Sequence, residues 1–134
     1  MTTADQEAVR LLRDAFPDLV AAYRFGSTST GTAGPQSDID LAILTRSRLD
    51  PNDRFALQER VASALRQTVD LVDLRAASTV MAMQVVGSGE LLYESDAGER
   101  GFFEDLTFSQ YARLNEERRG VLDRIAREGT VYGR

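Results

Sequence analysis

The stretch GSTSTGTAGPQSDIDLAIL, residues 26–44, joins a loop of small residues to an apolar run that starts with two aspartates. The alternating pattern predicts a strand over 38–44. Because side chains alternate along a strand, Asp38 and Asp40 share one face, roughly 7 Å apart, and the intervening aliphatic residues face the core. Two like charges at that distance repel by roughly 2 kcal/mol at an effective dielectric near 20. Taken alone, the pair fits either a solvated strand start, with Asp38 capping the loop, or a cation site.

A second strand, predicted over residues 19–25, runs directly into Gly26 and Ser27. Glycine lets the backbone approach an anion closely, and free backbone N–H groups beside a hydroxyl bind phosphate oxygens. The small residues that follow are also typical of a loose surface loop. The loop is therefore a candidate phosphate site only if a second feature lies beside it.

A third carboxylate comes from TVDLVDL, residues 68–74, which is a predicted strand. Asp70 and Asp73 are three positions apart, so they face opposite sides of the sheet, and only one of them can join Asp38 and Asp40. The other is expected at a strand end or as a capping residue. Three convergent carboxylates beside a Gly-Ser loop indicate a two-metal phosphoryl-transfer site.

The composition excludes most other catalytic chemistry. The 134 residues include no cysteine and no histidine, which excludes disulfides, thiol nucleophiles, histidine bases and nearly all catalytic zinc sites. All 16 basic residues are arginine, so a Walker-A lysine is absent too. Any metal must be a hard cation held by oxygens, such as Mg²⁺, Mn²⁺ or Ca²⁺. The net charge of −5 argues against broad nucleic-acid binding, and the pair Arg118-Arg119 fits a solvated helix face better than a phosphate patch.

The remaining pattern predicts an α/β fold, in which a small mixed sheet has flanking helices and a long C-terminal helix. Helices are expected over 4–15, 52–67, 79–86 and 96–127, with a short strand over 90–94. Asn52 is expected to cap the second helix, and Ser78 or Thr79 the third, which Gly87 and Gly89 end. The last helix is expected to begin with the capping-box pair Asp96/Glu99 and to kink at Gly120.

We expect one domain, residues 1–134, with a core over 1–95 and a helical segment over 96–134. No apolar run approaches the roughly 18 residues of a membrane span, and the N-terminus lacks the layout of a secretory signal. A cytoplasmic protein is expected on these grounds.

Gly-Ser, ten residues and then Asp-x-Asp resembles the signature of the DNA polymerase beta-like nucleotidyltransferase superfamily, and VDL on the later strand is similar to its third carboxylate. The chain looks most like the minimal nucleotidyltransferase (MNT) antitoxins of MNT/HEPN toxin–antitoxin pairs. The resemblance covers most of the chain, from the strand before Gly26 to the C-terminal helix.

The resemblance implies a role for each matching residue. Gly26 and Ser27 would hold the β- and γ-phosphates of ATP, and Asp38 and Asp40 would ligate both metal ions. Asp70 would ligate the second metal and help to deprotonate the attacking hydroxyl.

In that third role, Asp73 is the alternative to Asp70. The resemblance further implies a protein adenylyltransferase that uses ATP and two Mg²⁺ ions, with Mn²⁺ as a substitute. Its acceptor would be a tyrosine of a partner HEPN ribonuclease, held in a hetero-oligomer, with no membrane and no direct nucleic-acid contact.

Two positions depart from the family pattern. Thr28 stands where many relatives have arginine, and Arg24 stands at a strand position that is usually apolar. Arg24 is expected either to contact a phosphate or to be an edge residue whose charged end reaches solvent.

Two other functions stay open. A binding-only antitoxin would mask its toxin through the C-terminal helix, whose broken apolar stripe exposes Tyr111, Leu114 and Arg118; the alternative is that this helix packs across its own sheet. The second open function is nucleotidyl transfer to a small molecule such as an aminoglycoside. Enzymes of that kind usually have an additional acceptor-binding domain.

Overall fold

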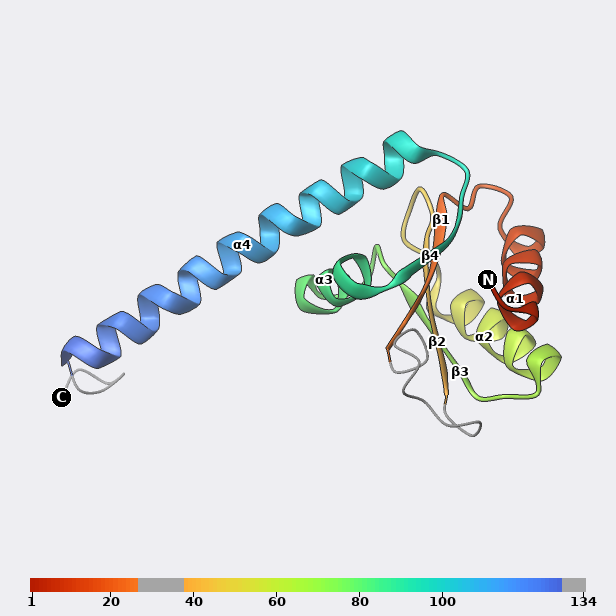
Figure 1. Cartoon of the computed structure of the whole chain (residues 1–134), viewed down its shortest axis with the longest axis horizontal. Helices are drawn as coiled ribbons and strands as arrows, with labels where there is room; N and C mark the ends of the chain where they lie inside the picture. Colours follow the sequence, from red (N-terminus) through yellow and green to blue (C-terminus); the bar gives the residue numbers. More distant parts are fainter. Residues whose placement is uncertain (27–37, 129–134) are drawn as a thin grey trace.

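A four-stranded sheet with helices on both faces forms the body of the protein (Figure 1). The computed structural model describes residues 1–26 and 38–128. Their elements are α1 (Thr3–Ala15), β1 (Ala21–Phe25), β2 (Ile39–Leu44), α2 (Pro51–Leu65), β3 (Val69–Asp73), α3 (Thr79–Ser88), β4 (Glu90–Glu94) and α4 (Ala97–Glu128). Every predicted helix and strand is present, so the predicted α/β class is confirmed.

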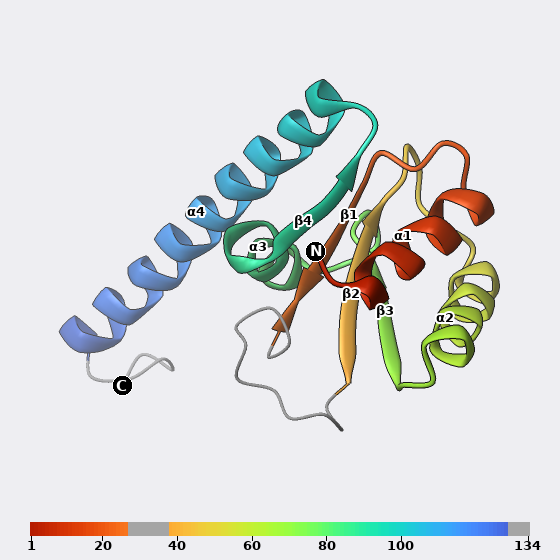
Figure 2. The same ribbon diagram turned by 45° about the vertical axis from the view of Figure 1, so that its right-hand side comes forward.

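The strand order is β3-β2-β1-β4. β2 and β3 are parallel, whereas β1 runs antiparallel to both of its neighbours, β2 and β4. The sheet is therefore mixed, as predicted. Figure 2 shows α1 and α2 on one face and α3 with the beginning of α4 on the other.

Strand alternation gives the sheet two apolar cores. Leu41 and Leu71 lie in the core beneath α1 and α2, whereas Tyr23 and Leu44 lie in the core beneath α3 and α4. A residue's place in a strand therefore decides which helices it meets.

The predicted helix bounds differ from the observed ones by one or two residues, and two of the residues expected to begin or end a helix do not do so. α2 is capped by Asp50 and not by Asn52: the Asp50 carboxylate accepts the Asn52 N–H at 2.7 Å, and Pro51 occupies the first helical position, where its fixed φ and missing N–H are tolerated. α3 is capped by Ser78 as predicted, but it continues through Gly87 to Ser88, and only Gly89 ends it.

α4 begins with half of the predicted capping box. The Asp96 carboxylate accepts the Glu99 N–H at 3.0 Å, but the Glu99 side chain pairs with Arg75 at 3.0 Å instead of returning to the cap. The helix then runs unbroken through Gly120 and is straight in both views, so the predicted kink is wrong (Figures 1 and 2).

Only the first turns of α4 pack on the body. Phe103 and Thr107 are its buried residues, and the helix then projects away from the sheet (Figure 1). The expectation that this helix packs across its own sheet is therefore wrong. In the described part of the chain, no helix is both long enough and apolar enough to cross a bilayer.

Candidate active site

Three predicted carboxylates belong to the start of two parallel strands at one end of the sheet. The register of β2 and β3 pairs Asp40 directly with Asp70. Adjacent strands lie about 4.8 Å apart, so these two side chains lie next to each other on the face that α3 covers. Asp38 precedes β2 by one residue and has the same strand parity as Asp40. Asp38 and Asp70 are exposed, whereas Asp40 is half-buried.

The three charges repel one another. Burial, followed by the negative charges of Asp70 and Asp38, raises the pKa of Asp40 above its ordinary value. None of the ion pairs among the described residues involves these three aspartates. The anionic oxygens therefore lack a compensating cation from the part of the chain that the structure describes.

This donor set suits a hard divalent cation, because such ions bind carboxylate oxygens and would offset the repulsion at Asp40. Within residues 1–26 and 38–128, however, no group of three acidic side chains is already arranged to hold a metal ion. That one ion is shared by Asp38, Asp40 and Asp70 stays a prediction.

Gly26 lies directly against the Asp40 carboxylate. Its φ is +77°, a left-handed conformation that side chains rarely adopt. A Cβ added there would stand 2.3 Å from Oδ2 of Asp40, so only glycine fits at this turn. The end of β1 and the start of β2 thus bring the predicted Gly-Ser turn and the first aspartate strand together. Ser27 and Thr28 lie outside the described residues.

Asp73 faces the opposite side of the sheet from Asp70. It is buried, and its carboxylate accepts the backbone N–H of Leu49 at 2.8 Å and that of Arg75 at 3.0 Å. These bonds hold the β2–α2 connection and the turn after β3. The structure therefore places Asp70, and not Asp73, beside Asp40.

Arg24 performs neither of the roles expected from the sequence. Its guanidinium makes two hydrogen bonds to the Asp5 carboxylate, at 2.8 and 2.9 Å, and one to Glu90 at 2.8 Å. β1 is an inner strand, and the Arg24 side chain is only 16% exposed, so it is not an edge residue reaching solvent. No sequence signal reveals this group, because its three members lie far apart along the chain.

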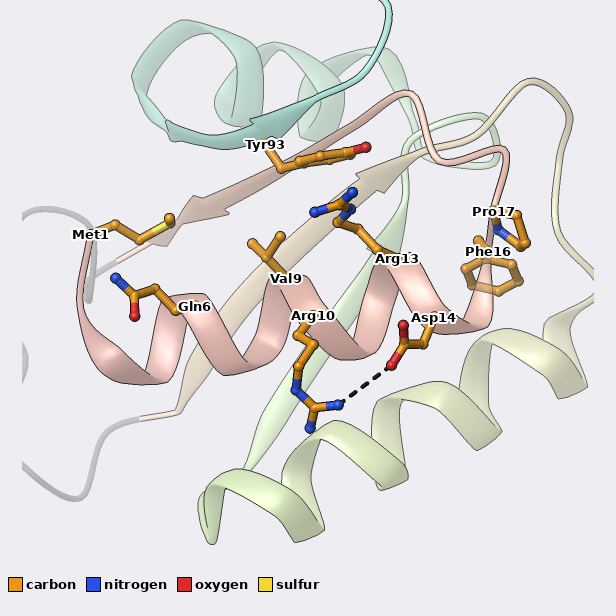
Figure 3. A pocket seen from close by; sticks show the side chains of 9 residues that line it. All are labelled: Met1, Gln6, Val9, Arg10, Arg13, Asp14, Phe16, Pro17 and Tyr93. Atoms are coloured by element: carbon orange, nitrogen blue, oxygen red, sulfur yellow. Dashed lines mark hydrogen bonds and ion pairs between the residues drawn. The ribbon is translucent and has the colours of Figure 1, made fainter.

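A pocket of about 530 Å³ lies elsewhere, between α1 and β4 (Figure 3). The Arg13 guanidinium lies 4.8 Å from the centre of the Tyr93 ring, and Arg10 pairs with Asp14 at 3.4 Å. None of the three site aspartates lines it. Its arginines are engaged by its own acid and aromatic side chains, so it is not a candidate for phosphoryl transfer.

Comparison with known proteins identifies the family. Residues 7–98 match the family described as polymerase beta, nucleotidyltransferase. The chain belongs to this family. The matched region contains Gly26, Asp38, Asp40 and the whole of β3, so the predicted superfamily is confirmed.

Relatives refine this assignment. The protein adenylyltransferase MntA of Shewanella oneidensis is 42% identical over 121 residues, which cover 90% of this chain and 86% of that protein. A crystal structure of a toxin–antitoxin with AMP-PNP aligns with a TM-score of 0.82 at 42% identity, over 91% of this chain and 98% of the other. The structure of a tri-AMPylated Shewanella oneidensis HEPN toxin in complex with MNT antitoxin aligns with a TM-score of 0.76 at 39% identity, over 92% of this chain and 96% of the other. The resemblance to MNT antitoxins is confirmed.

Proposed function

We propose that this chain is an antitoxin that transfers AMP from ATP onto a tyrosine hydroxyl of a partner HEPN ribonuclease. Two Mg²⁺ ions, replaceable by Mn²⁺, would be held by Asp38, Asp40 and Asp70. The pairing of Asp40 with Asp70 beside Gly26 is the observation that carries the proposal. The MntA relative and the AMPylated toxin complex support the acceptor and the partner.

The chemistry is an exchange at the α-phosphorus of ATP. The tyrosine oxygen forms a bond to that phosphorus, the bond to the bridging oxygen of the β-phosphate breaks, and pyrophosphate leaves. Bound Mg²⁺ would supply charge neutralisation of the triphosphate and a lower pKa for the attacking hydroxyl.

The chain's own residues have separate roles in this proposal. The Gly26 turn brings backbone close to the phosphates, since no side chain occupies its α-carbon. Asp70 takes the tyrosine proton, because it lies beside Asp40 and is exposed to an incoming acceptor. Asp38 is exposed as well, so the acceptor of a folded partner can reach this end of the sheet.

Transfer of label from ATP tests the proposal. The purified chain, the HEPN protein encoded next to it, Mg²⁺ and ATP labelled at the α-phosphate should together give a labelled HEPN protein with loss of its ribonuclease activity. The variant Asp38→Asn/Asp40→Asn should transfer at least a hundredfold less, whereas Asp18→Asn, an exposed aspartate away from the site, should leave transfer unchanged. Equal labelling by all three proteins would contradict the proposal, as would AMP transfer to an aminoglycoside in place of the HEPN protein.

A binding-only antitoxin is the second candidate, and the projection of α4 away from the body favours it. The two functions differ in one measurement. If the double aspartate variant still neutralises the toxin in cells, binding suffices; if it forms the complex without neutralising, AMP transfer is required. Either way the chain would act in the cytoplasm, where a ribonuclease toxin meets its RNA.

A further inference from the structure

Arg24 joins three elements of the fold just before the Gly26 turn. It lies on β1, two residues before that glycine. Its guanidinium bonds to Asp5 of α1 at 2.8 and 2.9 Å and to Glu90 of β4 at 2.8 Å. The three residues Arg24, Asp5 and Glu90 are here named the Arg24 clamp. The clamp thus holds the part of β1 that leads into the turn.

Arg24 and the site aspartates lie on opposite faces of the sheet. In the register of β1 and β2, Arg24 pairs with Leu41, which belongs to the core beneath α1 and α2. Asp40 pairs with the next residue, Phe25, and therefore faces α3. The sheet separates Arg24 from the proposed metal site, so any effect of Arg24 on a nucleotide passes through the backbone that leads to Gly26.

The position of that backbone matters because the turn fits closely against the site. The registered pairing of β1 with β4 ends at Arg24, whereas its pairing with β2 continues to Phe25. Gly26 follows with a φ of +77°, and a Cβ added to it would stand 2.3 Å from Oδ2 of Asp40. A shift of the end of β1 would therefore move the turn directly against or away from this carboxylate.

Asp5 is a fixed anchor for the clamp. It is buried and forms a capping box with Thr2, in which each residue accepts the backbone N–H of the other at 3.0 Å. The Asp5 carboxylate is therefore held at the start of α1 while it accepts from Arg24. Hydrogen bonds between two charged groups are shorter and stronger than neutral ones. The clamp thus ties the end of β1 to the start of α1 with a defined geometry.

The clamp is an inefficient source of stability. The side chain of Arg24 is 16% exposed and that of Asp5 is 4% exposed. Nε of Arg24 is buried and has no hydrogen-bond partner in the part of the chain that the structure describes. Removing two charges from water costs about as much as their attraction returns, and apolar side chains of similar volume often stabilise a fold equally well. What the charged clamp adds over an apolar contact is its geometry.

We propose that Arg24 is a positioning residue for the nucleotide: the Arg24 clamp holds the end of β1 so that the Gly26 turn already has the geometry that receives the phosphates of ATP. This inference rests on the proposed function, in which the turn binds phosphate. Without the clamp, part of the binding free energy of the nucleotide is used to order the turn. The affinity for ATP then falls, whereas the chemical step on bound ATP keeps its rate.

Arg75 offers a matched control at the opposite end of the sheet. Its side chain is 20% exposed, and its guanidinium bonds to the backbone oxygen of Thr45 at 2.8 Å and to Glu99 at 3.0 Å. Thr45 and Arg75 follow the carboxyl ends of β2 and β3, away from the end at which the site aspartates lie. Arg24→Lys and Arg75→Lys therefore make the same chemical change at similar burial, and only the first lies beside the turn.

Calorimetry of the full-length chain alone measures the Kd for AMP-PNP in the presence of Mg²⁺, well below the melting temperature of each variant. Arg24→Lys should weaken this Kd at least fivefold, because one ammonium nitrogen replaces the two nitrogens, Nη1 and Nη2, that bond to Asp5 and Glu90. Arg75→Lys should change it less than twofold. Equal weakening by both variants, or no weakening by Arg24→Lys, would overturn the proposal.

A double variant separates positioning from stability. Arg24→Met removes the clamp and leaves Asp5 buried without its cation, and adding Asp5→Asn removes that charge. The double variant should regain more than half of the lost melting temperature. Its Kd for AMP-PNP should stay at least fivefold weaker than that of the wild type, because the clamp is still missing. Recovery of affinity together with stability would show that Arg24 only stabilises the fold, and would overturn the proposal.

The positioning role and the transfer activity fail separately. In the transfer assay with the HEPN protein, Arg24→Lys should raise the KM for ATP at least fivefold and change kcat less than twofold. If Arg24→Lys weakens AMP-PNP binding but the wild-type chain transfers no AMP, the positioning role stands and the enzymatic function is wrong. If AMP transfer occurs and Arg24→Lys leaves Kd and KM unchanged, the enzymatic function stands and the positioning role is wrong. Absence of AMP-PNP binding to the wild-type chain would overturn both.

Discussion

Asp40 and Asp70 lie side by side on adjacent parallel strands, and the charge of Asp70 contributes to the raised pKa of Asp40. Their placement concentrates negative charge at one end of the sheet, next to a glycine that cannot be replaced without a collision. The proposed nucleotidyl transfer would use both features together, because the carboxylates would hold cations and the turn would admit phosphate.

The first prediction concerns stability and pH. A carboxyl group whose pKa is raised in the folded state binds protons more tightly there than in the unfolded chain. The contribution of Asp40 to folding stability is therefore most favourable in acid. It is lost as the pH rises from the ordinary pKa of an aspartate through the raised pKa of the folded state. Asp40→Asn should increase the free energy of unfolding at pH 7, without metal, by about 1 kcal/mol after solvent screening. Urea unfolding at several pH values measures the gain, which should vanish at pH 3. A gain that is equal at pH 3 and pH 7 would contradict this explanation.

The second prediction concerns Gly26. Gly26→Ala places a Cβ against Oδ2 of Asp40 in a left-handed backbone conformation, so it should cost about 1–3 kcal/mol of stability and reduce AMP transfer at least a hundredfold. Gly101→Ala is the control, because a Cβ there meets nothing within 4 Å and alanine favours the helix by roughly 0.5–1 kcal/mol. Thermal unfolding and the transfer rate measure both variants. Full transfer by Gly26→Ala would show that the close contact is not needed.

The third prediction separates Asp70 from Asp73. Asp70→Asn should abolish the rise in melting temperature that Mg²⁺ with an ATP analogue gives the wild-type protein, since Asp70 lies beside Asp40. Asp73→Asn should lower the melting temperature of the free protein, because Asp73 accepts two backbone N–H groups in a buried position. Its Mg²⁺-dependent rise should remain. Differential scanning fluorimetry distinguishes the two, and the reverse pattern would assign the third ligand to Asp73.

The fourth prediction concerns the ion pair between Arg24 and Asp5. Arg24→Met leaves the Asp5 carboxylate buried without its cation and should cost about 3–5 kcal/mol. Adding Asp5→Asn to that variant should recover more than half of the loss, because the uncompensated charge is then removed. Urea unfolding of the two single variants and the double variant gives the coupling. Strictly additive losses would mean that the two residues stabilise the fold independently.

The sequence alone determined the elements and the family. Apolar periodicity and turn residues act over a few positions, so every helix and strand was predicted. The local errors lie at helix ends, as at Asn52 and Gly87, and at the expected kink at Gly120. The spacing from Gly26 to Asp38 and Asp40 is likewise local, because these residues end one strand and begin the next along the chain.

Tertiary structure decided what depends on strand order and on residues far apart in the chain. The parallel pairing of β2 with β3 placed Asp70 beside Asp40 and turned Asp73 into a buried acceptor for two backbone groups. Arg24 forms its hydrogen bonds to Asp5 and Glu90 only because β1 lies between β2 and β4 and under α1. Local patterns specify on which face of a strand a side chain lies, but packing over the whole chain sets its partner on that face. The projection of α4 away from the body depends on the same long-range packing, so only the folded protein showed it.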